Sequence, residues 1–87
     1  MIDNTEQSRF ELEENGHLVW ANYRIRDGKH VLPHVEADPE LRGTGAAARL
    51  MQQIVDHARD QKLVLEPRCS YARAWFQRHP DAQDVLD

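Results

Sequence analysis

Several features that assign a chain to a specialised class of protein are scarce or missing here. There is a single cysteine, Cys69, so no internal disulfide can form, and a lone thiol is more typical of a reducing compartment. No apolar run is long enough to span a bilayer, and Met1–Glu6 has neither the basic nor the apolar part of a secretory signal. These absences predict a cytoplasmic protein with no membrane partner.

An excess of basic residues is also absent. The formal net charge is -4 at pH 7, which argues against non-specific nucleic-acid binding because such binding needs a basic face. The histidines have no metal-ligand spacing with one another or with Cys69, so we predict no metal site. The histidines considered as metal ligands are His17, His30, His57 and His79.

The composition indicates a globular domain. Of 87 residues, 40% are hydrophobic and 30% charged, which is too apolar for a disordered chain. Residues 1–8 are polar and are expected to be flexible. Residues 9–87 are therefore predicted to form one domain.

The first half of the chain has the pattern of a three-stranded antiparallel meander. Apolar and polar residues alternate over 9–14, 17–26 and 29–37, as in half-buried strands. Asn15-Gly16 and Asp27-Gly28 separate these runs, and both pairs suit the two-residue turn of a hairpin. In the third strand, Val31, Val35 and Ala37 are expected on one face, and Leu32, His34 and Glu36 on the other. Pro33 interrupts that strand and predicts an unpaired edge or a bulge.

After residue 40 the hydrophobic period becomes helical. Apolar residues from Ala47 to Ala58 follow a 3.6-residue period, which predicts a helix from about Thr44 to Asp60. A short fourth strand, Leu63–Leu65, and a second helix with Ser70 as its N-cap follow. The order β-β-β-α-β-α predicts a mixed α/β (α+β) fold whose fourth strand lies parallel to the third.

Two glycines stand between the third strand and the long helix. Gly43 and Gly45 let the backbone approach a ligand, the free N–H groups of the helix favour an anion, and Arg42 adds a charge suited to phosphate. A Walker loop is excluded because Ala46-Ala47 stands where Lys-Ser/Thr is needed. A helix start without a ligand remains an alternative.

A dinucleotide fingerprint is a further alternative for this segment. Gly43, Gly45 and Ala48 satisfy its spacing, and Glu66 lies where a ribose ligand is expected. The hairpins upstream and the short chain argue against it.

The segment Arg42-x-x-Gly45-x-Ala47 resembles the acyl-CoA signature of the GCN5-related N-acetyltransferases (GNAT). The resemblance extends to small single-domain members through His34-Val35-Glu36, Pro67-x-Cys69-x-Tyr71 and Arg78-His79-Pro80. It covers nearly everything from Phe10 to Leu86. The chain departs from these relatives at Ser70, at Gln61-Lys62 and at Ala82, and the last change is expected to weaken docking of the C-terminal tail.

This resemblance implies a minimal GNAT fold and acetyl transfer from acetyl-CoA to a primary amine, on a small molecule or a protein, by direct attack. The alternative is a non-catalytic CoA-binding or interaction module. In either case the protein is expected to be a monomer or a weak homodimer. The chain is expected to begin at the family's second strand, which would leave the acceptor site open. The implied cofactor-binding residues are Val35, Ala37, Leu41, Arg42, Gly43, Thr44, Gly45, Ala46, Ala47, Ser70 and Arg73.

The same resemblance places the pantetheine arm between the strands at 29–37 and 63–65, with a backbone N–H near Val35–Ala37 holding the developing oxyanion. An amine must lose a proton to attack, so a base is needed. Glu36 and His34 share a strand face and are the candidates, although they equally suit an ordinary solvent-facing pair.

Cys69 is expected beside the thioester. It can be an acyl-accepting nucleophile, a proton donor to the departing CoA thiolate or a small buried hydrophobic residue. The N-terminus of the second helix, with Arg68 and Arg73, can stabilise its thiolate. We favour a cysteine that lines the site. Tyr71 is the other candidate proton donor, or packs over the CoA arm.

Overall fold

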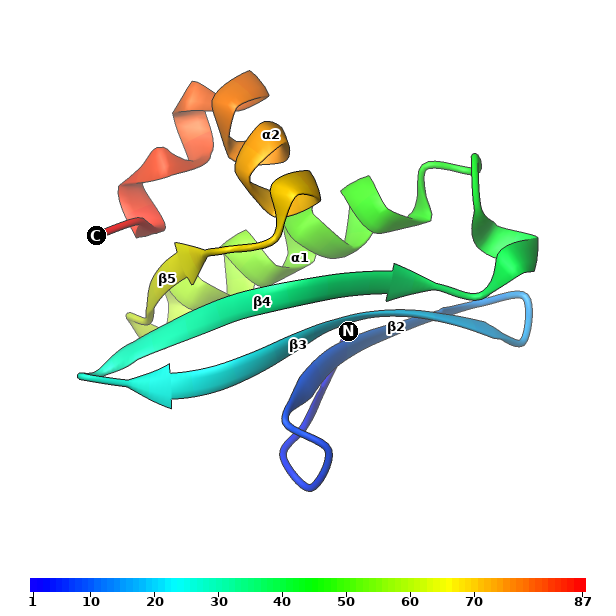
Figure 1. The fold of residues 1–87 in the computed structure, drawn as a ribbon, viewed down its shortest axis with the longest axis horizontal. Coiled ribbons are helices and arrows are strands. Elements are labelled where there is room, and N and C mark those ends of the chain that lie inside the picture. Colours follow the sequence, from blue (N-terminus) through cyan, green and yellow to red (C-terminus); the bar gives the residue numbers. More distant parts are fainter.

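The computed structural model describes residues 1–87 and contains one five-stranded sheet with helices on one of its faces (Figure 1). The strands are β1 (Ile2–Asn4), β2 (Arg9–Glu14), β3 (His17–Arg26), β4 (Lys29–Ala37) and β5 (Val64–Pro67). They lie in the sheet in chain order; β1 to β4 are antiparallel and β5 is parallel to β4. The predicted mixed α/β class and the parallel crossover are confirmed.

Two tight turns set the register of the antiparallel part. Asn15 and Gly16 have φ angles of 53° and 80°, and Asp27 and Gly28 have 53° and 78°. Positive φ at both central residues is the geometry of a type I′ turn, whose twist matches the strands on either side. The predicted hairpins and the bounds of β3 and β4 are confirmed.

A bulge interrupts β4 at Pro33. Asn22 pairs with His34 and Arg24 pairs with Val31, so one residue of β3 faces two residues of β4. Proline has no N–H to donate, and a bulge removes the need for one. The bulge predicted at Pro33 is confirmed.

The bulge also reverses the alternation of side chains along β4. Leu32, fully buried, joins the main core on the helix side with Val35 and Ala37. Val31 lies outside that core and opposite Arg24, on the other face. The predicted faces are therefore wrong for Val31 and Leu32, because the extra residue shifts the period of two by one.

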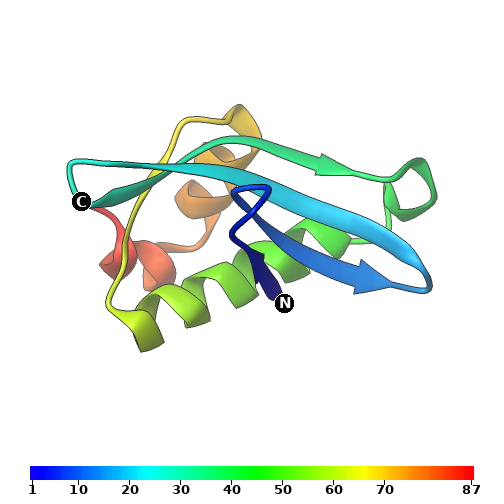
Figure 2. The same cartoon turned by 90° about the horizontal axis from the view of Figure 1, so that it is seen from below.

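The helical elements cover only the face of the sheet that carries the core (Figure 2). They are the 3-10 helix η1 (Pro39–Leu41), α1 (Ala46–Gln61), α2 (Ser70–Arg78) and the 3-10 helix η2 (Pro80–Val85). We call the uncovered face the open face. No helix is long and apolar enough to cross a membrane.

Some helix and strand limits differ from those predicted. α1 begins at Ala46 because Gly45, its N-cap, is left-handed at φ 86°, and it ends before Lys62, at φ 56°. β5 lies one to two residues later than predicted. The N-cap of α2 is Cys69, in extended geometry, and Ser70 is already helical. The side chain of Ser70 makes no capping hydrogen bond, so the prediction that Ser70 is the N-cap is wrong.

Both ends of the chain are more structured than expected. Residues 1–8 contain β1, whose Asp3 Oδ1 accepts a 2.7 Å hydrogen bond from the hydroxyl of Tyr23, and a short turn joins β1 to β2. The expectation that the first strand of the chain starts at residue 9 is wrong. At the other end, Ala82 is buried in η2 and Leu86 forms a parallel bridge with Leu65, so the tail is docked.

Candidate active site

The edge of β4 is only half covered by its neighbour. β5 pairs with the first four residues of β4, from Lys29 to Leu32, and then turns away. At that point the N–H groups of Arg68 and Cys69 both donate to the carbonyl oxygen of Leu32, at 2.9 and 3.1 Å. The remaining edge of β4, residues 33–37, has no partner strand on this side.

The unpartnered edge presents backbone donors. The N–H of Asp38 donates to Leu18 of β3, and Glu36 lies directly opposite Trp20. Because backbone groups alternate in direction along a strand, the N–H groups of Val35 and Ala37 point away from β3 and into the gap beside β5. These are the two residues of β4 predicted to contact the cofactor.

The glycine loop follows at the end of β4. Gly43 and Gly45 have φ angles of 77° and 86°, in the left-handed region that L side chains rarely adopt. The hydroxyl of Thr44 donates to the carbonyl oxygen of Leu41 at 2.6 Å and accepts from the N–H of Ala46 at 3.3 Å. Thr44 therefore holds the loop together from within.

The start of α1 has unsatisfied backbone donors. Its N-cap is a glycine, so no side chain caps it. Arg49 is the first residue of α1 whose N–H donates to a backbone carbonyl of the loop, that of Gly45, and the N–H groups of Ala47 and Ala48 have no acceptor. Free N–H groups at a helix N-terminus favour an anion. Ala48 was not among the predicted acyl-CoA-binding residues and entered only the dinucleotide alternative; its place in the first helical turn was the available signal.

These parts converge on one hollow of about 340 Å³. Its lining is mainly apolar and comes from the end of β4, the glycine loop, the start of α1 and Tyr71 of α2. The lining residues are Ala37, Leu41, Arg42, Gly43, Gly45, Ala46, Ala47, Ala48 and Tyr71. Most residues predicted to hold the cofactor thus meet here, whereas Val35, Thr44, Ser70 and Arg73 lie outside the lining.

Charged side chains lie beside the hollow, on the open face. The carboxylate of Glu36 is 2.6 Å from Nε2 of His34 and 3.6 Å from a guanidinium nitrogen of Arg42. His34 and Arg42 are more than half exposed, at 57% and 65%. The two predicted base candidates are therefore in contact with each other and accessible to solvent.

The arginines nearest to Cys69 are engaged elsewhere. Nε of Arg68 donates to Glu66 at 2.6 Å, and Nε of Arg73 donates to the carbonyl oxygen of Pro67 at 3.3 Å. Cys69 itself is half-buried against the core. Neither arginine forms a hydrogen bond to Cys69, which stays a candidate site residue at the N-terminus of α2.

Tyr71 holds its hydroxyl proton more strongly than an ordinary tyrosine does, because the pKa of that hydroxyl is raised. Its ring lines the hollow, and burial raises the pKa of its hydroxyl; Arg78 opposes this rise and Cys69 adds to it. The hydroxyl therefore stays protonated at neutral pH.

On the other side of the loop, Arg49 forms two 2.7 Å hydrogen bonds to Glu14, so Arg49 anchors α1 to the β2–β3 hairpin.

The sequence profile of the GCN5-related N-acetyl-transferase family matches residues 9–85. The chain belongs to this family. As a GNAT protein with this fold it is an acyltransferase, and the predicted family and enzyme class are confirmed.

A solved structure shows the same fold. It is the NMR solution structure of a GCN5-like protein from Staphylococcus aureus with proposed N-acetyltransferase activity. The two chains are 22% identical with a TM-score of 0.68, over 92% of this chain and 89% of the other. At this identity the comparison supports the minimal GNAT fold alone. No curated protein matches at a significant level.

Proposed function

We propose that this GNAT domain binds acetyl-CoA in the hollow at the start of α1 and transfers the acetyl group to a primary amine by direct attack. The observation that carries the proposal is the convergence of the glycine loop, the end of β4 and Tyr71 on one hollow. Members of the GNAT family generally use acetyl-CoA. The residues present suit that substrate.

The pyrophosphate of CoA would lie against the glycine loop. The free N–H groups of Ala47 and Ala48, at the positive end of the α1 dipole, are donors for phosphate oxygens. Arg42 is exposed and held only loosely by Glu36, at 3.6 Å, so its guanidinium can turn to a phosphate. The positive φ angles of Gly43 and Gly45 allow the tight loop against which the pyrophosphate would lie.

The pantetheine arm would follow the open edge of β4. Its amides can pair with the free backbone groups of Val35 and Ala37, as an added strand does. The gap ends where Arg68 and Cys69 bond to Leu32, so the thioester would stop beside Cys69.

The transfer itself needs a base, an oxyanion site and an acid. Glu36, in contact with His34, accepts the proton of the incoming ammonium. The amine nitrogen then forms a bond to the thioester carbon, and a free N–H of the β4 edge stabilises the negative oxygen. As the C–S bond breaks, Tyr71 donates its proton to the CoA thiolate, and the second proton that the nitrogen loses as the amide forms restores the Tyr71 hydroxyl. Cys69 lines the end of the gap, and direct attack needs no bond to its sulfur.

Calorimetry with CoA and acetyl-CoA tests the first part. We expect both to bind, and we expect Arg42→Glu to weaken binding at least about tenfold because a charge-assisted contact is replaced by a repulsive one. Lys62→Glu, with the same charge change at the far end of α1, should bind normally. Absence of binding at millimolar ligand would refute the proposal.

An amine panel separates the enzyme from a non-catalytic CoA-binding module. The module would bind CoA tightly and acetylate no amine. Turnover in the wild type that is lost in Arg42→Glu would exclude it.

A further inference from the structure

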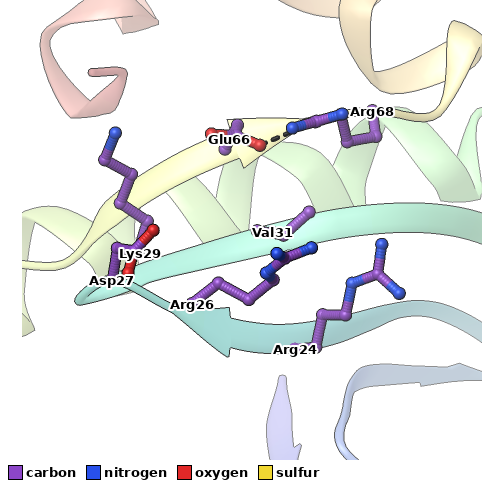
Figure 3. A pocket seen from close by; sticks show the side chains of 7 residues that line it. All are labelled: Arg24, Arg26, Asp27, Lys29, Val31, Glu66 and Arg68. Carbon is purple, nitrogen blue, oxygen red and sulfur yellow. Dashed lines mark hydrogen bonds and ion pairs between the residues drawn. The ribbon is translucent and has the colours of Figure 1, made fainter.

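A second hollow lies on the open face of the sheet, at the opposite end of β4 from the glycine loop (Figure 3). It measures about 140 Å³ and is lined almost entirely by charged side chains. The lining residues are Arg24, Arg26, Asp27, Lys29, Val31, Glu66 and Arg68. We call it the basic hollow.

The register of β3, β4 and β5 brings the residues of the basic hollow together. Arg24 and Arg26 are two residues apart on β3 and therefore share a face. Arg24 pairs with Val31, which in turn pairs with Glu66 of β5. Val31 is only 3% exposed although no helix covers this face, so the surrounding side chains cover it. Figure 3 shows the side chains of Arg24 and Arg26 extending from β3 toward β4, with the guanidinium group of Arg26 beside Val31.

The basic hollow has an excess of positive charge in a protein of net charge -4. Arg68 is paired with Glu66 and Lys29 with Asp87. Neither Arg24 nor Arg26 forms an ion pair or a side-chain hydrogen bond. Two neighbouring guanidinium groups without an anion repel each other, and a carboxylate or phosphate between them removes that repulsion.

The basic hollow adjoins the proposed acetyl-transfer site. Arg68 forms part of its wall, and the next residue, Cys69, marks the end of the gap where the thioester is expected. His34, opposite Asn22, lies on the same face between the basic hollow and Glu36. An acceptor that approaches the thioester from the open face would pass beside Arg24.

We propose that the acceptor amine carries an anionic group, a carboxylate or a phosphate, and that Arg24 and Arg26 hold this group while the amine reaches the thioester. This inference rests on the proposed function. The small volume of the hollow and the negative charge of the whole protein suit one anionic group and do not suit a nucleic-acid backbone, which needs an extended basic face.

Matched acceptors test this proposal. Short peptides with a free amine and one glutamate at the first, second or third following position are compared with their glutamine counterparts, and phosphoserine peptides with serine peptides. We expect kcat/KM to be at least about tenfold higher for the best anionic peptide than for its neutral counterpart. Comparing the glutamate peptides with the phosphoserine peptides shows whether the enzyme prefers a carboxylate or a phosphate. Equal rates for every anionic peptide and its counterpart would overturn the proposal.

Variants connect that preference to the basic hollow. Arg24→Gln combined with Arg26→Gln should abolish the preference and leave the rate on neutral peptides unchanged, because both side chains are exposed and outside the CoA hollow. Lys62→Gln, a charge change remote from both hollows, should keep the preference. A preference that survives in the double variant would refute the role of Arg24 and Arg26.

A direct binding measurement separates failure of this inference from failure of the proposed function. The Arg24 and Arg26 Nε–H signals are followed by NMR during titration with inorganic phosphate and with glutarate. Saturable shifts that the double variant lacks would support the basic hollow as an anion site even if no amine is acetylated. Signals that do not move would contradict it even if acetyl-CoA binds and turns over.

Discussion

The backbone N–H of Cys69 lies 3.1 Å from the carbonyl oxygen of Leu32, and this bond ends the pairing of β4 with β5. Arg68 donates to the same oxygen, at 2.9 Å. One carbonyl thus fixes both the inner end of the gap along β4 and the position of the cysteine beside it.

Gly45→Val should impair both CoA binding and stability. Gly45 has φ 86°, a conformation that costs an L side chain about 1–2 kcal/mol, and a new Cβ would lie 3.0 Å from a guanidinium nitrogen of Arg49. We expect CoA affinity to fall at least about tenfold as the loop deforms. Calorimetry and urea unfolding measure the two effects.

Gly28→Val is the matched control for Gly45→Val. Gly28 has φ 78° and open space around it, at a turn remote from the CoA hollow. The Gly28→Val variant should lose a similar amount of unfolding free energy and keep the CoA affinity of the wild type. Equal losses of affinity in the two variants would show that the Gly45 effect is general destabilisation.

Cys69→Ala should retain most of the acetyl-transfer rate. Its sulfur packs against the core, the nearby arginines bond to other groups, and direct attack does not use it. Intact-mass spectrometry after incubation with acetyl-CoA should show no acyl adduct. An adduct on Cys69, together with an inactive alanine variant, would establish covalent catalysis instead.

Tyr71→Phe should lower kcat at least about tenfold and leave CoA affinity nearly unchanged, because the ring remains and the acidic proton is lost. Burial raises the pKa of Tyr71, so the wild-type rate should stay high until the pH exceeds the ordinary tyrosine value of about 10. That alkaline decline should be absent in the variant. An unchanged kcat would assign the proton donation to another group.

Acid should destabilise the fold through His30. Its Nδ1 is buried without a partner, and burial lowers the pKa of His30, with Asp3 opposing and His57 adding to the shift. The unfolded chain therefore binds a proton more readily than the folded one. The stability contributed by neutral His30 is present above about pH 6.5 and is lost as the pH falls toward the lower pKa of the folded state.

His30→Phe tests this pH effect. The ring lies 5.1 Å from that of Tyr23, in a cluster that can accept a phenyl group. Urea unfolding at pH 5 and pH 7.5 should show a smaller loss of unfolding free energy for the variant than for the wild type. The same loss in both proteins would assign the acid sensitivity to other groups.

Local chemistry made much of this fold predictable. Asn15-Gly16 and Asp27-Gly28 determine their turns through backbone preference alone, and the apolar period from Ala47 to Ala58 is long enough to identify a helix. The glycine loop could be placed because its residues are contiguous between a strand and a helix. Each signal lies within a few residues of the structure that it specifies.

Features that depend on distant partners could not be predicted. β1 has only three residues, too few for a period, and is tied by Asp3 to Tyr23, 20 positions away. The partner chosen by Arg49 and the pairing of Arg24 with Val31 depend on the register of the complete sheet. The basic hollow therefore has no signature in the linear sequence.

The extra residue at Pro33 has a consequence for how this chain can change in length. Deleting Pro33 would remove the bulge and leave a regular strand, with His34 and Glu36 still on the open face and Val35 and Ala37 still on the helix side. Deleting Val35 instead would turn Glu36 toward the apolar core and Ala37 toward the open face. Length changes are thus tolerable in the turns and at the bulge, and far less so in the regular part of β4 that follows it.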